Sequence, residues 1–380
     1  MYNDPIDKVN RKDAERMQKK DVLIVYGQDA RQMAYDLLRA AQVEKMIPGK
    51  GARIALKPNL VGAIPAEEGA TTHPALLAGA VEYLQERGFQ NISIVEGSWV
   101  GDRTQAAFEA CGYRALSERY GVPLIDTQKE KAYTADCHGM QLQICNCVRE
   151  IDFLINMPVL KGHCQTAVTC ALKNMKGLIP NGEKRRFHSM GLMKPIAHLN
   201  TAIRQDFVLV DALCGDLNFE EGGNPVERGQ VLGFLDPVLC DAWACEEMGY
   251  AISDVPYIAM AEALGVGSAD TGSVNVTELN RPQVRRESLR ATRRVASLAR
   301  CVRQRDACSA CYAGLIYALQ RLEDEGIPAP KTVAIGQGWR GQGGALGVGQ
   351  CTCGFERFAP GCPPRAADIF AFLKAQAEEE

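Results

Sequence analysis

Short β-rich runs alternate with helix-like segments through the first 210 residues, and this alternation restricts the fold more than any other feature. Apolar and β-branched side chains make five of the runs candidates for buried strands: 21–27, 52–56, 91–97, 151–160 and 206–212. Helical patterns fall between them, at 29–46, 74–88, 104–119 and 165–179. Strands separated by helices predict an α/β fold with a mostly parallel sheet, right-handed crossovers and helices on both faces. The less regular stretch 120–150 predicts a small antiparallel insertion.

The rest of the chain divides at a change in composition. Residues 237–250 and 254–267 predict two further helices on the first domain, whereas residues 268–307 hold few large apolar side chains and many arginines. A compact unit follows, in which two helical patterns flank a short strand and a glycine-rich turn. We therefore expect three regions: an α/β domain over 20–270, a basic connector over 271–305 and a small C-terminal α/β unit over 306–380.

The composition points to an ordinary globular protein of a reducing compartment. With 46% hydrophobic residues, 23% charged residues and a formal net charge of -3, nothing global indicates binding to nucleic acid or to an anionic membrane. No apolar run reaches the length of a membrane span, and the first residues are too polar for a signal peptide. The 15 cysteines are odd in number and several stand alone in apolar runs, as Cys170 and Cys240 do. A disulfide framework is therefore not expected, and we predict a cytoplasmic location.

Five cysteines near the C-terminus form the pattern with the most chemical content. Cys308 and Cys311 are one helical turn apart, and Cys351, Cys353 and Cys362 follow within the same small unit. Cys311 opens a helical pattern, and Cys362 precedes two prolines and the last helix, so helix N-termini can stabilise thiolates there. The glycines beside Cys351 and Cys362 keep side chains away from the backbone and would let amide groups approach bound sulfur.

An iron–sulfur cluster suits this pattern better than zinc, a redox-active dithiol or unligated thiols. A structural zinc site often has two C-x-x-C pairs, whereas the second half here is Cys351-Thr-Cys353 with a single Cys362. Four ligands are needed and five candidates exist. We predict one [4Fe-4S] cluster held by Cys308, Cys311, Cys351 and Cys362. Cys351 is preferred to Cys353 because Gly349 gives it a flexible approach, but the choice between these two stays open.

Two resemblances support this interpretation. The stretch "GQC…GCPP" before a helix resembles the cluster-binding end of small hydrogenase-type and NADH-dehydrogenase-type subunits, which hold one [4Fe-4S] cluster. Residues of roughly 50–250 resemble the family called domain of unknown function 362, whose members often occur with an iron–sulfur module. The motifs that carry this second resemblance are "KPNLV", "TTHP", "IVEGS", "PVLKGH", "ALKNMKGLIP", "FH" and "DPVLCDAWA". The layout is also faintly similar to that of the nickel-pincer lactate racemase group, an analogy of fold only.

Polar side chains follow the predicted strands where ligands bind in open parallel sheets. Lys57 and Asn59 follow the second strand, Glu96 ends the third, Lys161 and His163 follow the fourth, and Asp211 ends the fifth. The predicted helix 165–179 adds a polar face. Its members are Thr166, Thr169, Lys173 and Lys176, opposite an apolar stripe of Val168, Leu172, Met175 and Ile179. We predict that Lys57, Asn59, Thr169, Lys173 and Lys176 bind a small carboxylate or phosphate.

Histidines supply the candidate acid and base groups. We predict catalytic roles for His163 and His188, which titrate near neutral pH, and for Lys161 beside them; either histidine could instead be structural. Residues 181–188, with Lys184 and two arginines, are expected to form a mobile loop that closes over an anion. Thr71 or Thr72 is expected to cap the helix that begins at Pro74, and Asp236 to cap the helix after it. Phosphate-loop and nucleophile-elbow motifs are absent from the sequence.

These features predict an iron–sulfur oxidoreductase, or a redox-gated enzyme, that acts on a small anionic substrate. Two other functions remain open. The protein could be an electron-transfer or assembly partner whose basic connector docks a redox protein, with no substrate of its own. It could also be a non-redox isomerase or lyase in which the cluster is a scaffold or Lewis acid. Neither nucleic acid nor membrane is an expected partner.

Overall fold

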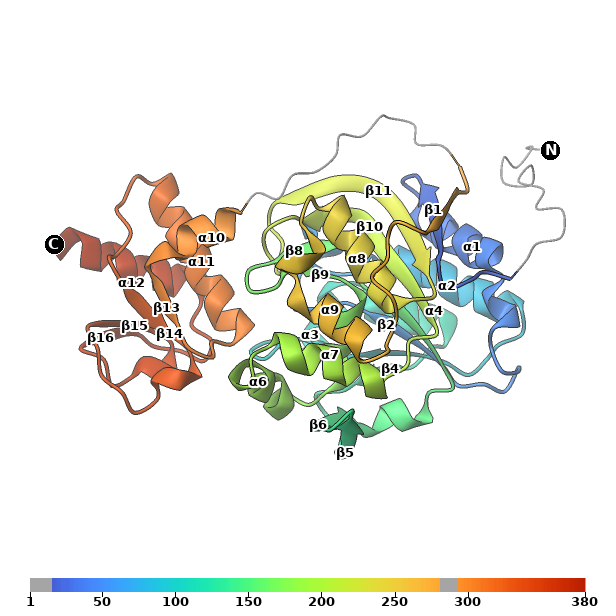
Figure 1. Ribbon diagram of the computed structural model, residues 1–380, viewed down its shortest axis with the longest axis horizontal. Coiled ribbons are helices and arrows are strands. Elements are labelled where there is room, and N and C mark those ends of the chain that lie inside the picture. Colours follow the sequence, from blue (N-terminus) through green and yellow to red (C-terminus); the bar gives the residue numbers. More distant parts are fainter. Residues whose placement is uncertain (1–15, 281–292, 380) are drawn as a thin grey trace.

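An eight-stranded sheet forms the centre of the larger part of the protein in the computed structural model, which describes residues 16–280 and 293–379 (Figure 1). Its strands stand in the order β12 (Asn275–Glu278), β1 (Asp21–Tyr26), β11 (Pro225–Phe234), β10 (Phe207–Asp216), β7 (Phe153–Met157), β2 (Ile54–Pro58), β3 (Ile92–Glu96) and β4 (Leu124–Asp126). Neighbouring strands run parallel except for the two pairs that β11 makes. The predicted α/β fold with a mostly parallel sheet is therefore confirmed.

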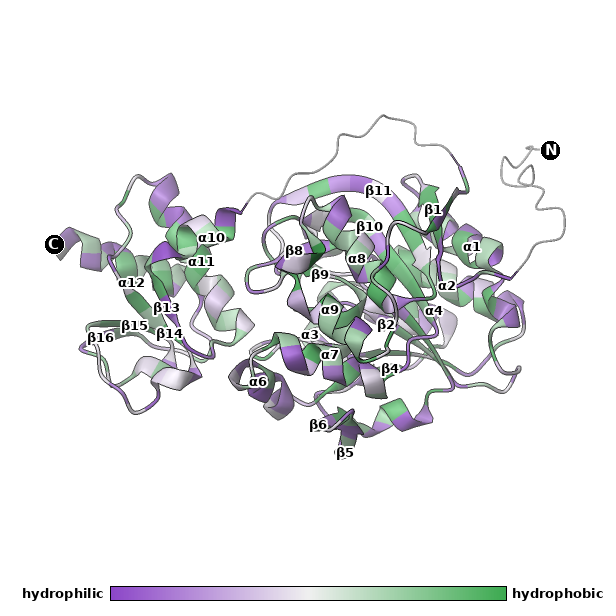
Figure 2. Ribbon diagram, viewed as in Figure 1, coloured by the Kyte–Doolittle hydropathy of each residue, from purple (hydrophilic) through white to green (hydrophobic). Residues whose placement is uncertain are grey.

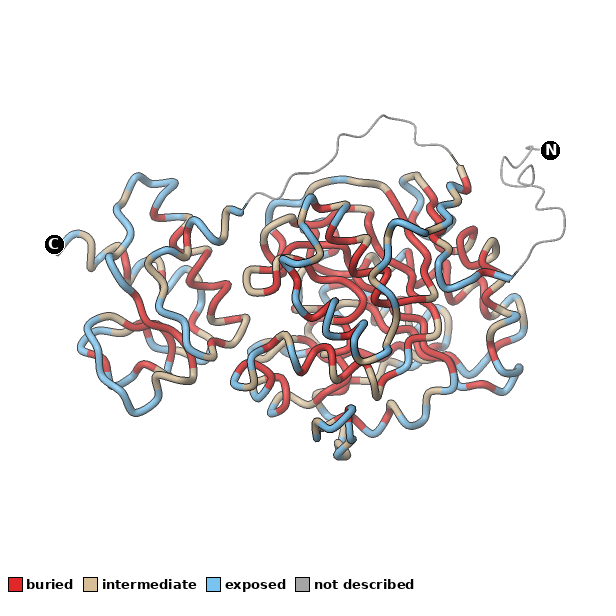
Figure 3. Tube along the Cα trace, in the orientation of Figure 1, coloured by how far each residue is buried: buried red, intermediate tan, exposed pale blue. Residues whose placement is uncertain are grey.

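Helices cover both faces of this sheet. One face packs on α1 (Ala30–Ala41), α2 (Pro74–Glu86), α3 (Thr104–Ala110) and α4 (Tyr113–Tyr120). The other packs on α5 (Ala171–Asn174), α7 (Met193–Ala202), α8 (Pro237–Glu247) and α9 (Pro256–Ala263). Side chains alternate along the strands, so Val22 and Ile24 enter one core while Leu23 and Val25 enter the other. The central strands are accordingly hydrophobic and buried (Figures 2 and 3).

All five predicted strands are present, as β1, β2, β3, β7 and β10. The antiparallel insertion is the hairpin of β5 (Ala132–Cys137) and β6 (Met140–Cys145). The helix predicted over 104–119 is two helices, because Gly112 adopts a left-handed conformation between them (φ +75°). β10 continues to Asp216, so Asp211 lies within the strand and not at its end.

The helix predicted over 165–179 is wrong in its first half. β8 (Lys161–His163) and β9 (Ala167–Thr169) form a hairpin there, and the helix begins only at Ala171, followed by the short 3-10 helix η5 (Met175–Leu178). The turn is held by His163, whose Nδ1 accepts the backbone N–H groups of Gln165 and Thr166. Ala167 has a left-handed φ of +61°, which a helix does not allow. Thr166 therefore does not share a helical face with Lys173.

Two local expectations also change. Residues 181–188 form the ordered helix α6 (Asn181–Ser189), not a mobile loop. The helix at Pro74 starts from His73 without a side-chain cap, because the Thr72 hydroxyl instead donates to the carbonyl of Met157. Asp236 caps α8 as predicted, accepting from the amides of Val238 and Leu239.

The C-terminal unit has its own sheet and core. Four parallel strands stand in the order β13 (Val302–Gln304), β14 (Val333–Ile335), β15 (Leu346–Val348) and β16 (Arg357–Ala359). The helices α10 (Arg294–Leu298), α11 (Ser309–Asp324) and α12 (Ala366–Glu379) pack with them around a core that includes Leu315, Leu319, Leu322, Ile369 and Leu373. Residues 281–292 of the predicted basic connector lie outside the described residues.

The unit sits beside the larger part, next to α6 and the β8–β9 hairpin (Figure 1). Ser309 donates to Gln165, and Gln337 donates to the carbonyl of Arg185. None of the helices in the two described ranges combines the length and apolar character that a membrane crossing requires.

Candidate functional site

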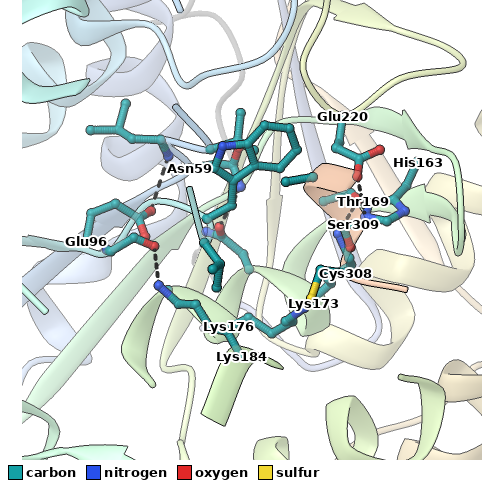
Figure 4. Close-up of a pocket in the computed structure, with 18 of the residues that line it drawn as sticks. Asn59, Glu96, His163, Thr169, Lys173, Lys176, Lys184, Glu220, Cys308 and Ser309 are labelled. Carbon is teal, nitrogen blue, oxygen red and sulfur yellow. Dashed lines mark hydrogen bonds and ion pairs between the residues drawn. The ribbon is translucent and has the colours of Figure 1, made fainter. Parts of the chain in front are cut away.

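A pocket of about 710 Å³ lies between the carboxyl edge of the large sheet and the start of α11 (Figure 4). The segments after β2 and β3, the β8–β9 hairpin, η5, α6 and the first residues of α11 all contribute to its wall. Of the predicted site residues, those in the wall are Asn59, Lys161, His163, Thr169, Lys173, Lys176, His188 and Cys308. Asn59 and Cys308, which are 249 positions apart in the sequence, thus line the same cavity.

Lys57 is not in the pocket wall but beneath it. Its side chain is fully buried, and its ammonium lies 2.6 Å from Glu96 Oε2. The same ammonium donates to Asn174 Oδ1 at 3.3 Å, and Asn174 Oδ1 also accepts from Asn59 Nδ2 at 3.0 Å. Burial lowers the pKa of Lys57, while Glu96 opposes that shift. Lys57 therefore supports the position of Asn59 and Asn174 and does not reach a ligand.

Gly177 of η5 lies directly against this buried pair. A Cβ added to Gly177 would lie 2.0 Å from Glu96 Oε1 and 2.6 Å from Lys57 Nζ. We expect Gly177→Ala to destabilise the protein by about 1–3 kcal/mol, because the pair has no room to move in a packed interior. Gly182→Ala is the matched control, since a Cβ there meets nothing within 4 Å. Equal denaturant midpoints for the two variants would contradict the expectation.

The protein itself supplies hydrogen-bond acceptors for the ammonium groups of two lysines of the wall. Lys161 is buried and donates to Asn59 Oδ1, to the Ala70 carbonyl and to the Glu220 carbonyl. Burial, with help from Lys173, lowers its pKa to about 7. Lys184 donates to the carbonyls of Gly97 and Ser98, and burial lowers its pKa to about 8. Both amines hold the loops of the pocket together.

Lys173 and Lys176 differ from these, since neither has a carboxylate partner within the described ranges. The Lys173 ammonium donates to Thr169 Oγ1 at 3.4 Å, and the Lys176 ammonium lies 5.9 Å from the centre of the Phe187 ring. Burial lowers the pKa of Lys173 to about 8. Burial and then Lys173 lower the pKa of Lys176 well below its ordinary value. An anion between the two amines would restore their charge and satisfy their donors.

The two pocket histidines are not equivalent. His163 Nδ1 accepts two backbone N–H groups, so the proton of the neutral ring lies on Nε2, which is 3.0 Å from Glu220 Oε1. Accepting a further proton would break those amide contacts. His188 lines the same pocket, and its ring nitrogens have no hydrogen-bond partner in the part of the chain that is described. Burial lowers the pKa of both histidines well below the ordinary value, with nearby lysines adding to the shift.

Four of the five clustered cysteines meet in a second, smaller cavity. Cys308 is the N-cap of α11 and Cys311 lies in its first turn, while Cys351 lies in the 3-10 helix η9 (Gln350–Thr352). With Cys362 they line a cavity of about 360 Å³. Cys353 is exposed and lies outside this lining.

Two glycines and two polar side chains shape this cavity. Gly349 and Gly361 have φ values of +87° and +134°, and a Cβ on Gly361 would lie 2.5 Å from Pro364 Cα. Arg340 donates to the Cys351 sulfur at 3.4 Å, and Gln337 Nε2 lies 3.6 Å from the Cys308 sulfur. These donors suit sulfur that carries negative charge.

The spacing of the four thiols bears on which metal group they fit. Two groups of side chains in the described residues have ligand atoms that all lie within 4.8 Å of one another: His163, Cys164 and Glu220, and Cys170, Cys240 and Asp241. Each of these could hold a single ion. The four cysteines are not such a group, whereas a zinc ion with bonds of about 2.3 Å would draw its sulfur ligands to within about 4 Å of each other. An all-thiolate set with wider spacing fits a multi-iron cluster.

The protonation of Cys308 and Cys311 agrees with a site that binds a cation. Burial raises the pKa of Cys311 to about 12, and the neighbouring Cys308, Cys362 and Cys351 add to the shift. Burial also raises the pKa of Cys308, while Arg185 and Lys176 oppose it. Four thiolates in one cavity repel one another, so a positively charged metal group is needed to hold them deprotonated.

Cys308 belongs to the walls of both cavities. Sequence reasoning did not reveal this adjacency. It also missed Glu220, whose buried carboxylate accepts from the Cys164 amide and faces His163. Its only signal was the acidic pair Glu220-Glu221 in a glycine-rich stretch, which is indistinguishable from a solvated loop. Arg185 was placed in the anion site but lies in the cysteine cavity.

Comparisons with known proteins show what the chain is similar to. The chain is 26% identical over 227 residues to the "Thylakoid-associated protein sll1697" of Synechocystis sp., covering 57% of this chain and 69% of that one. A lactate racemase apoprotein from Thermoanaerobacterium thermosaccharolyticum gives a TM-score of 0.36 at 13% identity, over 51% of each chain. The chain therefore spans about half the length of that solved structure.

A family model matches residues 54–246, slightly more than half of the chain, and these residues hold β2, β3, β7, the β8–β9 hairpin, η5 and α6. The matched segment thus contains the pocket wall except for its α11 residues, and it stops before the cysteine cavity. The chain belongs to the family described as Domain of unknown function (DUF362).

Proposed function

We propose that this chain is an iron–sulfur oxidoreductase that acts on a small carboxylate or phosphate. Cys308, Cys311, Cys351 and Cys362 would hold one [4Fe-4S] cluster, and the pocket beside them would hold the substrate. The observation that carries the proposal is the position of Cys308, which lines both cavities. A substrate in the pocket would therefore lie next to a cluster ligand. Cytoplasmic location remains part of the proposal and rests on the stray thiols of the sequence.

The pocket lysines would bind and orient the anion. Lys173 and Lys176 approach from α5 and η5, and neither forms an ion pair with a carboxylate of the described residues. Asn59 and Thr169 line the same pocket and can add neutral hydrogen bonds. The binding energy comes from restoring two amines to their charged form as well as from direct attraction. Lys57 and Lys161 keep the surrounding loops in place.

The two pocket histidines differ in how freely they can exchange protons. His188 is the group that can take a proton, because it is neutral and its ring nitrogens are free to accept. His163 is less suited to this role, because its Nδ1 accepts two amides and its Nε2 faces Glu220 Oε1 at 3.0 Å. When bound, an iron–sulfur cluster would supply or accept one electron at a time. Arg185 and Arg340 line the cysteine cavity and would offset its negative charge.

Anion binding should weaken as pH rises. In the free protein the pKa of Lys173 is lowered to about 8 by burial, and the anion binds its protonated form. Affinity for inorganic phosphate or succinate should therefore fall above that value by up to roughly tenfold per pH unit. Titration calorimetry at a series of pH values measures this. Lys173→Met should remove most of the affinity and the part of the pH dependence that Lys173 causes, whereas Lys45→Met, a change at an exposed lysine outside the pocket, should leave both unchanged.

The proposed contact between substrate and cluster is tested on the anaerobically purified, cluster-loaded protein. Electron paramagnetic resonance of the reduced protein should change when the anion is added, because the pocket and the cluster share Cys308. Lys173→Met should remove that change and leave the spectrum of the anion-free protein intact. An unchanged spectrum at saturating anion would contradict contact between the two sites.

The two other functions give different results. An electron-transfer partner without a substrate should bind none of the anions tested. A non-redox isomerase or lyase should turn over at the same rate with the cluster locked in either oxidation state.

A further inference from the structure

A separate cavity of about 1,660 Å³ opens beyond the carboxyl end of β1 and along β10 and β11. It shares no lining residue with the anion pocket. Its wall contains His73, Cys214, Glu67, Glu227 and Arg228. None of these residues has a part in the function proposed above, so the two inferences stand or fall independently.

Three side chains of this region form a connected row. Asp211 is fully buried on β10, and its Oδ2 accepts both the backbone N–H of His73 at 2.8 Å and His73 Nδ1 at 2.9 Å. Its other oxygen accepts the Leu213 amide at 3.1 Å. With Nδ1 held in this way, His73 Nε2 faces the sulfur of Cys214 at 4.0 Å. This is the order of orienting group, base and nucleophile found in nucleophilic sites.

The row lies beside a β-bulge. The pairing of β10 with β11 shifts between Ala212 and Cys214, where two residues of β11 stand against one of β10, so the extra residue belongs to β11. Bulges of this kind are common next to active sites.

The row places a charged imidazole beside the sulfur of Cys214. Burial alone would lower the pKa of His73, but Asp211 and then Cys214 outweigh it and raise the pKa to about 10. The ring is therefore a cation at neutral pH, placed between a carboxylate and a sulfur. An imidazolium beside a cysteine stabilises its thiolate, which is the nucleophilic form.

We propose that Cys214, His73 and Asp211 form a second reactive site, in which the sulfur of Cys214 takes an acyl group from an uncharged thioester. In this step a bond forms between the Cys214 sulfur and the acyl carbon, and the carbon–sulfur bond of the donor breaks. The electron pair leaves with the donor sulfur, which takes the proton from His73 Nε2. The products are an S-acyl cysteine, a neutral His73 and a free thiol.

Two features of the site select this class of donor. A histidine that holds its proton this firmly is a weak acid, suited to a thiolate leaving group and poorly suited to an alkoxide or an amide nitrogen. Glu67 and Glu227 lie in the cavity wall, while Arg228 is paired with Glu247. An anionic donor would be repelled, so the electrophile should be neutral.

The probe is S-acetyl-N-acetylcysteamine, a small neutral thioester, added to the full-length, cluster-loaded protein. Peptide mapping by mass spectrometry follows the acetylation of each cysteine. Cys214 should be acetylated at least roughly tenfold faster than Cys353, which is exposed but has no imidazole beside it. Cys111 is a second reference. Its buried sulfur contacts the backbone carbonyl of Ile64, as the Cys214 sulfur contacts that of Ala66 at 3.4 Å, but it has no histidine beside it.

The variant His73→Gln should slow acetylation of Cys214 by roughly 100-fold and leave Cys353 unchanged. Circular dichroism and iron content show whether this variant is folded. If it is not folded, the acetylation rates of Cys214 and Cys353 in the wild-type protein decide the proposal without the variant. Acetylation of Cys214 no faster than that of Cys353, or a rate unaffected by His73→Gln, would overturn the proposal and leave the row as a structural contact. Anion binding and iron content do not enter this result.

Discussion

Cys362→Ser should reduce the iron content from about four irons per chain to below about one, because loss of one thiolate leaves the cluster incompletely held. Cys353→Ser is the matched control. It changes the same residue type nine positions away, and both cysteines are exposed, but Cys353 does not line the cysteine cavity. Iron and acid-labile sulfide are quantified after anaerobic purification, and electron paramagnetic resonance identifies the cluster type.

Several outcomes of this experiment would contradict the assignment. Stoichiometric zinc without sulfide would show that the site holds a structural zinc ion and not an iron–sulfur cluster. Iron loss on Cys353→Ser but not on Cys351→Ser would show that Cys353, and not Cys351, is the fourth ligand. Equal iron content in Cys362→Ser and wild type would show that Cys362 is not a ligand. The structure favours Cys351, because its sulfur faces the same cavity as Cys308 and receives a hydrogen bond from Arg340.

Lys57→Met should lower the free energy of unfolding by about 3–5 kcal/mol, the cost of leaving a buried charge without its partner. Lys57 and Glu96 are both buried, and their charged atoms lie 2.6 Å apart. Denaturant unfolding of the variant measures the loss. The double variant Lys57→Met/Glu96→Gln should recover part of it, since the unpaired carboxylate is then gone.

Arg53→Met provides the surface control for this experiment. Arg53 pairs with Asp152 at 2.9 Å, but the two side chains are 52% and 37% exposed. Water screens the pair, so its loss should change stability far less than the loss of Lys57 does. If the two substitutions had equal effects, the Lys57–Glu96 pair would not be the support beneath the pocket that we infer.

The sequence alone was sufficient for the α/β class and for five of the eight strands of the large sheet, because buried parallel strands are continuous apolar runs and carry a strong local signal. Asp236 as the cap of α8 also followed from sequence, since capping is decided by neighbouring residues. Where a side chain made a less local bond, prediction failed. Thr72 does not cap α2, because Asn59 and Met157, from two other strand ends, hold its hydroxyl.

The stretch 165–179 shows the same limit more clearly. Its apolar residues recur at helical spacing, yet residues 167–169 pair with 161–163 as a hairpin. His163 accepts two amides of the turn, and this contact outweighs the helical pattern. The histidine singled out for acid/base chemistry thus has one ring nitrogen committed to the fold.

What the sequence by itself determined is the list of reactive groups: the clustered cysteines, the lysines after the strands, and the two histidines. Tertiary structure alone decided which of them meet. Lys57 is placed beneath the pocket, Cys353 outside the cysteine cavity, and Cys308 between the two cavities. The physical reason is that ligand sites depend on distances between segments far apart in sequence, and those distances are set by packing of the whole sheet and its helices, not by local pattern.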